Sequence, residues 1–178
     1  AAAAATVVSA GAGAHAGAAR AVEWNPRVPT LLASAGDDGH VLVWDFGRGA
    51  AAGGAVTPLT PVGVAPSPPG VAGADAPAGA APAKEAMLCV GWNRQMQQIL
   101  AGGGAAGVTA VWDLRQKRRV IALRHPRGRL TCSGLAWSPT VATQLLTASA
   151  ERGALLWDLR NATALLRSLR DHREGIAD

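Results

Sequence analysis

Short apolar runs separated by polar turns recur along the chain in groups of three. In the first group, mostly apolar runs occupy residues 21–24, 31–34 and 41–44, and turn residues fill positions 25–26 and 36–39. The Asp-Gly pair in the second turn favours a tight hairpin, because both residue types tolerate positive φ. Short strands joined by tight turns predict an antiparallel sheet, since a parallel sheet needs longer crossover connections.

The same grouping returns twice further along the chain. The second copy has apolar runs at 87–92, 98–101 and 108–112, and the third has them at 132–137, 144–147 and 154–157. A fourth run follows each of these copies as a predicted outer strand, at 120–123 and 165–169. The predicted units are residues 15–50, 84–124 and 125–170. Residues 6–9 are expected to be the outer strand of a preceding unit.

Tryptophan marks the same two positions in every group. Each group ends on a Trp-Asp pair and has a second tryptophan 20 positions earlier. The pairs are Trp44-Asp45, Trp112-Asp113 and Trp157-Asp158, and the earlier tryptophans are Trp24, Trp92 and Trp137. These are all six tryptophans of the chain, and the second and third groups are 45 residues apart. A Trp-Asp signature with a period of about 40–45 residues is typical of WD-repeat β-propeller blades.

We therefore predict an all-β fold in which residues 1–178 form a partial WD-repeat β-propeller of about three four-stranded antiparallel blades. A blade is stable when neighbours cover both of its faces, and closed propellers use about 4–8 blades. Three blades leave two faces uncovered, so we expect a part of a larger, seven-bladed propeller. His172 and Gly175-Ile176 are expected to begin the next unit.

One segment departs from the period. Trp44 and Trp112 are 68 residues apart instead of 45, and the excess falls in residues 47–83. This segment contains seven prolines and eight glycines and is otherwise rich in alanine. Such a composition buries too little apolar surface to offset the entropy of ordering it. Residues 47–83 are therefore predicted to be a disordered loop insertion.

Basic residues concentrate in one stretch of a chain whose formal net charge is +5. They are Arg115, Lys117, Arg118, Arg119, Arg124, Arg127 and Arg129. Such a stretch suits contact with phosphates or an anionic membrane surface. We interpret it as a solvated strand edge, where charge discourages pairing with other chains, and we predict no nucleic-acid binding. The alternative, a nucleic-acid binder, predicts an affinity that falls linearly with the logarithm of salt concentration.

Cys89 and Cys132 are the only cysteines, and each lies in an apolar run. They are interpreted as small buried hydrophobic residues in a reducing compartment, and a bridge between them is also compatible with the sequence. No run of 18 or more strongly apolar residues is present, so no membrane span is predicted. The first residues lack the basic and Leu-rich regions of a signal peptide.

Histidine, serine and aspartate recur around the Trp-Asp pairs. In a WD-repeat unit, a histidine before the first strand joins a hydrogen-bonded set with a turn aspartate, a strand serine and the signature tryptophan, whose indole N–H needs an acceptor. The first unit offers His15, Asp38 and Trp44, with Gly36 at the position expected for the serine. We expect this set to be structural.

The other units offer less complete sets. The third has His125, Ser149 and Trp157, with Glu151 in place of the aspartate, and the second has Ala106 at the aspartate position and no histidine. His172 lies where His15 lies, just before a new unit. Such sets recur once per blade and separate blades do not converge on one substrate atom, so we do not interpret them as acid–base catalysts. No phosphate-loop, metalloprotease, zinc-finger or nucleophile-elbow motif occurs. We predict no enzyme activity, no cofactor and no metal.

Two stretches go beyond the general repeat pattern. The sequence GWNRQMQQILA at 91–101, followed by VWDLR at 111–115, resembles the N-terminal propeller of the larger outer-cage subunit of COPII vesicle coats, the Sec thirty-one family. The sequence CSGLAWSPTVATQLL at 132–146 resembles the next blade of the same family. The chain departs from the family pattern in its longer insertion and in a shorter hairpin at 150–153.

The resemblance implies a structural role in the COPII outer coat. Cage assembly through protein–protein contacts of the propeller would serve vesicle transport from the endoplasmic reticulum to the Golgi. The implied partners are a smaller WD-repeat cage subunit, further copies of the same subunit and, through regions outside this chain, the inner coat and its small GTPase. The implied location is the cytosol and the cytoplasmic face of exit sites and vesicles, peripheral to the membrane. The alternative is a general WD-repeat adaptor, such as a substrate receptor or chromatin scaffold.

Overall fold

The structure, a computed structural model, describes residues 14–47, 55–59, 85–126, 128–149, 151, 153–161 and 165–169. These residues form twelve strands and one short 3-10 helix, η1 (Leu159–Asn161). The strands are β1 (Ala19–Trp24), β2 (Leu31–Gly36), β3 (Val41–Asp45), β4 (Ala55–Leu59), β5 (Met87–Trp92), β6 (Ile99–Gly104), β7 (Val108–Asp113), β8 (Arg118–Arg124), β9 (Cys132–Trp137), β10 (Gln144–Ser149), β11 (Gly153–Asp158) and β12 (Leu165–Leu169). The predicted strand at 6–9 and His172 lie outside the described residues.

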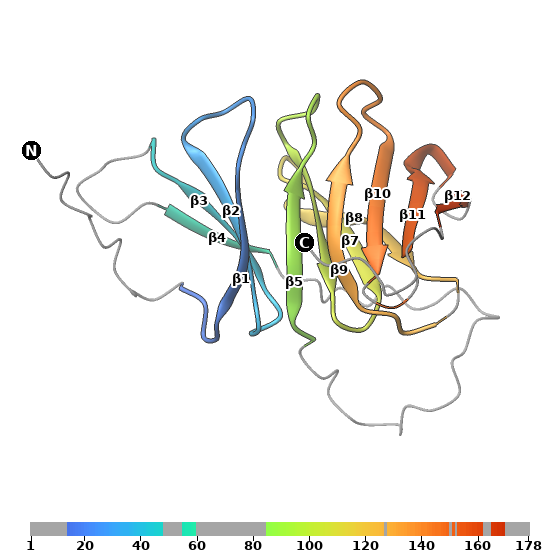
Figure 1. Cartoon of the computed structure of the whole chain (residues 1–178). Coiled ribbons are helices and arrows are strands. Elements are labelled where there is room, and N and C mark those ends of the chain that lie inside the picture. Colours follow the sequence, from blue (N-terminus) through green and yellow to red (C-terminus); the bar gives the residue numbers. More distant parts are fainter. Residues whose placement is uncertain are drawn as a thin grey trace, which may run out of the picture.

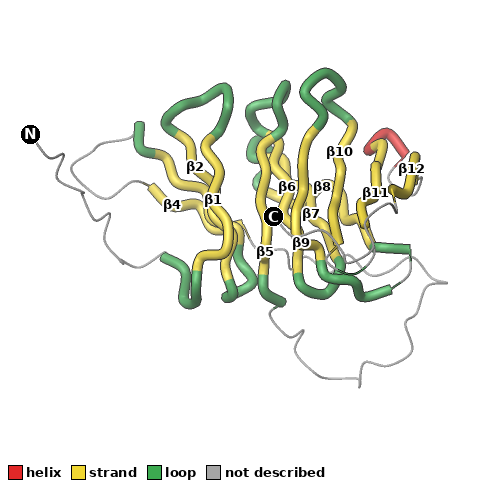
Figure 2. Tube along the Cα trace, viewed as in Figure 1, coloured by secondary structure: helices red, strands yellow, loops and turns green. Residues whose placement is uncertain are grey.

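The strands form three four-stranded antiparallel sheets in which each strand pairs with the next one in sequence (Figure 1). We call them blade 1 (β1–β4), blade 2 (β5–β8) and blade 3 (β9–β12). Short turns join β1 to β2, β2 to β3, β5 to β6 and β6 to β7 (Figure 2). The predicted all-β fold of three four-stranded blades is confirmed.

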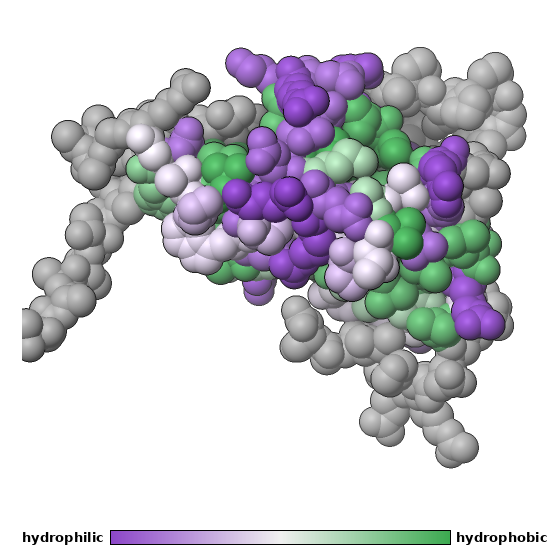
Figure 3. All heavy atoms as spheres, turned by 90° about the horizontal axis from the view of Figure 1, so that it is seen from above, coloured by the Kyte–Doolittle hydropathy of each residue, from purple (hydrophilic) through white to green (hydrophobic). Residues whose placement is uncertain are grey.

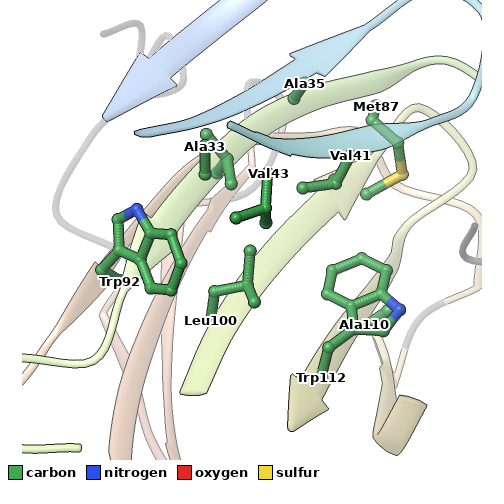
Figure 4. Packing of buried hydrophobic residues seen from close by; sticks show 10 residues of the cluster. Ala33, Ala35, Val41, Val43, Met87, Trp92, Leu100, Ala110 and Trp112 are labelled. Atoms are coloured by element: carbon green, nitrogen blue, oxygen red, sulfur yellow. The ribbon is translucent and has the colours of Figure 1, made fainter. Parts of the chain in front are cut away.

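The blades stand side by side and pack face to face. The first strands are neighbours, because β1 contacts β5 and β5 contacts β9. Between blades 1 and 2, small residues of β2 and β3, such as Ala33 and Val43, pack against Trp92, Leu100 and Trp112 (Figure 4). A second cluster joins blades 2 and 3 and consists of Ala101, Val111, Leu123, Trp137, Leu145, Leu155 and Trp157. The hydrophobic core of this chain therefore lies at the boundaries between blades.

Blade 1 has a fourth strand that composition did not predict. Within the segment expected to be disordered, β4 pairs with β3 so that Trp44 faces Val56 and Leu42 faces Pro58. A proline cannot donate a ladder hydrogen bond, but it is tolerated on an edge strand. The prediction of disorder is therefore wrong for residues 55–59, because pairing along the edge of β3 needs backbone groups and few apolar side chains. The rest of 48–83 lies outside the described residues.

The first strand of every blade carries an irregularity at an equivalent position. The register shifts between Ala19 and Ala21 in β1, between Met87 and Cys89 in β5, and opposite Ala148 and Ser149 in β9. A bulge adds one residue and re-aims the side chains that follow it. As a result, the start of β5 contributes Met87 to the boundary with blade 1 and Cys89 to the boundary with blade 3.

Candidate functional site at the blade boundaries

Blade 1 contains a hydrogen-bonded set that links four side chains. His15 Nδ1 lies 2.9 Å from Asp38 Oδ1, and His15 Nε2 lies 2.8 Å from Ser34 Oγ. The indole N–H of Trp44 donates to the same Ser34 oxygen at 2.9 Å. A neutral His15 satisfies both partners when Nδ1 carries the proton, donating to Asp38 and accepting from Ser34. The set ties the segment before β1 to β2, β3 and the turn between them.

The serine of this set is two positions earlier than the sequence reasoning placed it. The prediction put it at Gly36, but the hydroxyl is supplied by Ser34. A Cβ at Gly36 would lie 2.5 Å from Nδ1 of His15. Glycine is therefore needed at position 36 so that the imidazole can approach. The hydroxyl comes from Ser34, two residues along β2 from Leu32, which pairs with Trp44.

The Asp38 carboxylate accepts several hydrogen bonds in a partly desolvated position. Besides His15, the backbone amides of Ala16 and His40 donate to it, at 2.9 and 3.1 Å. Burial raises the pKa of Asp38, but these hydrogen bonds outweigh it and lower the pKa to about 2. Asp38 is therefore a carboxylate at neutral pH and acts as an acceptor that fixes the turn.

Blade 3 uses a different hydroxyl from the one predicted. The Trp157 indole donates to Thr147 Oγ1 at 2.9 Å, whereas Ser149 Oγ accepts the backbone amide of Glu151 at 3.2 Å. Thr147 lies ten positions before the tryptophan, as Ser34 does in blade 1. The predicted set of His125, Ser149 and Trp157 is therefore wrong in its hydroxyl. His125 and both hydroxyl residues line a cavity of about 20 Å³.

In blade 2 the equivalent position is Gly102, so the hydroxyl is missing as well as the aspartate and histidine. A Cβ at Gly102 would lie 3.2 Å from the Trp112 ring and 2.8 Å from the end of Met87. Both side chains belong to the cluster between blades 1 and 2. Apolar packing against the glycine thus occupies the place that the hydroxyl takes in the other two blades.

The first tryptophan of a blade bonds to the blade before it. Trp92 Nε1 donates to the carbonyl of Glu23 at 3.1 Å, and Trp137 Nε1 donates to the carbonyl of Gly91 at 3.0 Å. Each acceptor directly precedes the first tryptophan of its own blade. The bond therefore repeats from one boundary to the next and fixes the position of each blade relative to its neighbour along the strand direction. A Cβ at Gly91 would collide with Leu135, so the close approach also depends on this glycine.

Buried asparagines form a second contact that repeats at both boundaries. The Asn25 side-chain amide donates to the carbonyl of Gln97 at 2.8 Å, and that of Asn93 donates to the carbonyl of Ala142 at 2.7 Å. The Oδ1 of Asn93 accepts two amides of its own turn, at 2.9 Å each, and Asn25 does the same. In blade 3 the position is Ser138, whose hydroxyl caps its turn in the same way.

Sequence reasoning missed this inter-blade role. Asn25 was interpreted as a turn residue, which it is, but its amide group also reaches the next blade. The signal was the repeat of Trp-Asn at 24–25 and 92–93. We call Asn25 and Asn93 the boundary asparagines.

A charged contact lies across the boundary of blades 1 and 2. Glu23 Oε2 accepts the backbone amide of Trp92 at 2.6 Å, and Glu23 Oε1 pairs with Arg94 at 3.0 Å. Burial raises the pKa of Glu23, while the Trp92 amide and Arg94 partly offset that rise. The carboxylate thus extends the tryptophan–carbonyl contact that the Glu23 backbone makes.

The aspartates of the three Trp-Asp pairs cap turns. Asp45 accepts the amide of Gly47 at 2.9 Å, Asp113 that of Arg115 at 2.8 Å, and Asp158 that of Arg160 at 3.1 Å. A carboxylate that bonds to the backbone two residues on defines an Asx-turn. The Arg160 side chain also pairs with Asp158 and, with its amide, lowers the pKa of Asp158 to about 2. These aspartates shape the connection to the outer strand.

The basic stretch is divided between β8 and the surrounding loops. Arg118, Arg119 and Arg124 lie on β8, the outer strand of blade 2, and Arg129 pairs with Glu85 at 2.9 Å. Hydrophilic side chains also gather on the face seen from above in Figure 3. The turns after β5 and β9 lie at this end of the blades in Figure 1. Polar surface is thus spread over turns and edges.

Other kinds of site are not found among the described residues. In that part of the chain, no group of three or more His, Cys, Asp or Glu residues is placed to hold a metal ion. No helix there is both long and apolar enough to cross a membrane. The recurrent chemistry of the described residues is hydrogen bonding and packing within and between blades.

Repeated four-stranded sheets, Trp-Asp turns and tryptophan contacts between neighbours define a segment of a WD-repeat β-propeller. Among curated proteins, the chain is 36% identical over 165 residues to protein transport protein Sec31A of Danio rerio and of Homo sapiens. The match covers 91% of this chain and 11% and 12% of those proteins. It is 34% identical to protein transport protein SEC31 of Chaetomium globosum, again over 91% of this chain and 11% of the relative. The chain thus spans about a tenth of the length of these relatives.

Solved structures agree with the sequence match. A chain of the COPII outer coat vertex on membranes superposes with a TM-score of 0.70 and 25% identity, covering 90% of this chain and 40% of that one. A chain of the COPII coat assembled on membranes gives the same TM-score and identity, with 22% of its length covered. No model of a protein family matches the chain. The predicted resemblance is confirmed: the chain is a homologue of the Sec31A proteins, and its fold is that of a COPII outer-coat propeller segment.

Proposed function

We propose that this chain is a propeller segment of a COPII outer-coat subunit and serves cage assembly in vesicle transport from the endoplasmic reticulum to the Golgi. The observation that carries the proposal is the match to Sec31A over nine-tenths of the chain, together with the superposition on the outer coat vertex. Because the chain spans only about a tenth of those relatives, its part is confined to what a propeller segment can do.

The geometry supports a structural and not a catalytic role. The His15–Ser34–Trp44 set and the Trp157–Thr147 pair lie in different blades, and each bonds its own blade together. The inter-blade bonds of Trp92 and Trp137 likewise end on backbone carbonyls. We infer that this segment is not an enzyme and that the sites predicted from the WD repeats maintain a rigid surface for protein–protein contacts.

The proposed partners are other coat subunits at a cage vertex, namely a smaller WD-repeat cage subunit and further copies of the same subunit. Contacts with the inner coat and its small GTPase would use regions outside this chain. The proposed location is the cytoplasmic surface of exit sites on the endoplasmic reticulum and of the vesicles that form there. No nucleic-acid partner is proposed, since the basic stretch is divided between the outer strand β8 and the surrounding loops, where Arg129 pairs with Glu85.

A chimera tests the proposal. The matching segment of human Sec31A is replaced by this chain, and the purified chimera is mixed with the other COPII components and vesicles of anionic lipids. We expect electron microscopy to show cages with vertices like those of unaltered Sec31A. A chimera carrying Trp92→Ala, which removes the boundary contact, should form fewer cages. A folded chimera that joins its partner subunits but never forms cages would contradict the vertex role and favour an adaptor function.

A further inference from the structure

The two cysteines of the chain meet at the boundary of blades 2 and 3. Cys89 comes from β5 and Cys132 from β9, and their Sγ atoms lie 3.7 Å apart. Both residues are buried, with exposed fractions of 6% and 5%. They are separated by 43 positions in sequence and lie on adjacent blades, so their contact arises only from the stacking of the blades.

A glycine on the neighbouring strand makes room for both sulfur atoms. Gly103 of β6 pairs with Cys89 across the sheet. A Cβ at position 103 would lie 2.7 Å from the Cys89 sulfur and would collide with the Cys132 sulfur. Because residue 103 is glycine, no side chain of β6 occupies the space beside the two thiols at this position.

The two thiols have different surroundings. The hydroxyl of Thr109 donates to Cys132 Sγ at 3.6 Å, and the Cys132 thiol lies 3.5 Å from the carbonyl of Gly134. Hydrogen bonding from Cys89, followed by that from Thr109, lowers the pKa of Cys132 despite its burial. A lowered pKa favours the thiolate, which is the form that oxidants attack.

Of the two cysteines, only Cys132 lines the cavity described above in blade 3. The cavity measures about 20 Å³ and is bounded by hydroxyl groups and His125 in addition to Cys132. Leu130 and Thr131, from the connection between β8 and β9, also line it. A partly polar space of this size accommodates a molecule of about the size of water, and hydrogen peroxide is the small polar oxidant of nearest size.

We propose that Cys132 and Cys89 form a peroxide-sensitive thiol pair that closes a disulfide between blades 2 and 3. The Cys132 thiolate attacks one oxygen of hydrogen peroxide, the O–O bond breaks, and Cys132 sulfenic acid and hydroxide form. The Cys89 thiol then attacks the sulfenic sulfur, the S–S bond forms, and the sulfenic oxygen leaves as water. Two thiols are oxidised and one peroxide is reduced to two waters, so the step balances. This inference is independent of the proposed coat function.

The disulfide would join two blades that otherwise associate through packing and hydrogen bonds. A cross-link between distant positions restricts the unfolded chain more than the folded one. The oxidised protein should therefore unfold at a higher urea concentration than the reduced protein. The thiol pair would thus cross-link the boundary of blades 2 and 3, whereas the boundary of blades 1 and 2 has no cysteine pair.

The test begins with the reduced protein, treated with hydrogen peroxide under native conditions and then denatured and alkylated. We expect peptide mass spectrometry to show one linked peptide pair that contains Cys89 and Cys132 and lacks two hydrogen atoms. In Cys89→Ser, Cys132 should stop at the sulfenic acid and be labelled by dimedone. In Cys132→Ser, Cys89 has no second thiol beside it, so no linked peptide pair should form within the chain.

Two further variants separate chemistry from folding. Thr109→Val keeps the side-chain shape but removes the bond to Cys132, and should slow disulfide formation severalfold. Ser133→Ala, in the adjacent bulge, should leave the rate unchanged. The proposal is overturned if the native protein keeps both thiols, if cross-links form only between chains, or if Cys132 in Cys89→Ser is not labelled by dimedone.

Discussion

The two sequence-equivalent tryptophan pairs of blades 1 and 2 have very different surroundings. Trp92 and Trp112 of blade 2 are 0% and 1% exposed, because blade 1 covers them. Trp24 of blade 1 is 55% exposed and touches Phe46, with ring centroids 5.6 Å apart, while Trp44 is half-buried. The repeat gives Trp24 and Trp92 equivalent positions in their sheets, and likewise Trp44 and Trp112. Whether a neighbouring blade covers the side chain decides how much it contributes to stability.

This difference shows how stability is distributed in the chain. Trp44 keeps its bond to Ser34 without a covering blade, so its role within the blade is local. Trp24 holds the position in blade 1 that Trp92 holds in blade 2, where the indole bonds to the preceding blade. Identical residues at equivalent positions of a repeat thus have equivalent geometry. Their contribution to the free energy of unfolding depends on whether a partner blade covers them.

The largest predicted effect concerns Trp92. Trp92→Ala should lower the free energy of unfolding by about 3–5 kcal/mol, since a fully buried aromatic side chain leaves a cavity and its bond to Glu23 is lost. Trp24→Ala in the same chain should cost less than about 1 kcal/mol because the ring is half exposed. Urea titration followed by far-UV circular dichroism measures both. Equal losses for the two variants would show that a covering blade does not decide the contribution.

A smaller effect is expected for the boundary asparagine of blade 2. Asn93→Ala removes two turn bonds and the bond to Ala142, and should cost about 2–3 kcal/mol. Asn93→Ser copies blade 3 and retains the turn cap, so only the inter-blade bond is lost, at about 1 kcal/mol. The same urea titration separates the two variants. If the serine variant loses as much as the alanine variant, the turn cap has no share in the effect.

The hydrogen-bonded set of blade 1 should give an acid-dependent effect that blade 2 lacks. The folded pKa of Asp38 is about 2, below its ordinary value of about 3.9, so its stabilising contribution is full above about pH 4 and is lost as the pH falls toward 2. The difference in unfolding free energy between the native chain and Asp38→Ala should be about 1–2 kcal/mol larger at pH 6 than at pH 2. The control Ala106→Gly, at the equivalent position of blade 2, should show the same difference at both pH values.

The smallest effect is predicted for the charge of Glu23. Burial raises its pKa, so its charged form is disfavoured, and Glu23→Gln can keep an oxygen near the Trp92 amide. The cost should be below about 1 kcal/mol. Glu23→Ala should cost more, because the buried amide of Trp92 loses its acceptor. Thermal unfolding of the two variants distinguishes them, and equal losses in both variants would show that the ion pair with Arg94 dominates.

Much of the fold could be predicted because the Trp-Asp period identifies both the strands and their order. The side-chain partners were harder to predict. Ser34 was missed because the Trp44 indole bonds to a hydroxyl two residues along β2 from Leu32, the residue that pairs with Trp44. The boundary asparagines were missed because a turn role already accounted for Asn25. Strand β4 was missed since an edge strand needs little apolar sequence of its own.

Contacts between blades are the feature that is hardest to predict from a single sequence. Cys89 and Cys132 lie in runs that look alike, and nothing in either run indicates that their sulfur atoms meet. The contact depends on the bulges at the start of β5 and β9, which direct the Cys89 thiol toward blade 3 and the Cys132 thiol toward blade 2. A residue's own neighbours in sequence determine its strand and face, but its partner across a boundary is set by how two sheets are stacked.

The connection between blades 1 and 2 is the longest between described strands, running from Leu59 to Met87, while Arg124 to Cys132 joins blades 2 and 3. Lengthening a loop fourfold raises its closure cost by only about 1 kcal/mol. The connection acts mainly by keeping the effective concentration of blade 1 high near blade 2, and the boundary side chains determine the geometry. A chain divided between Leu59 and Met87 would retain every bond from Glu23 and Asn25 to blade 2. Blade 1 would then bind as a separate ligand, and its affinity would measure the strength of a single blade boundary.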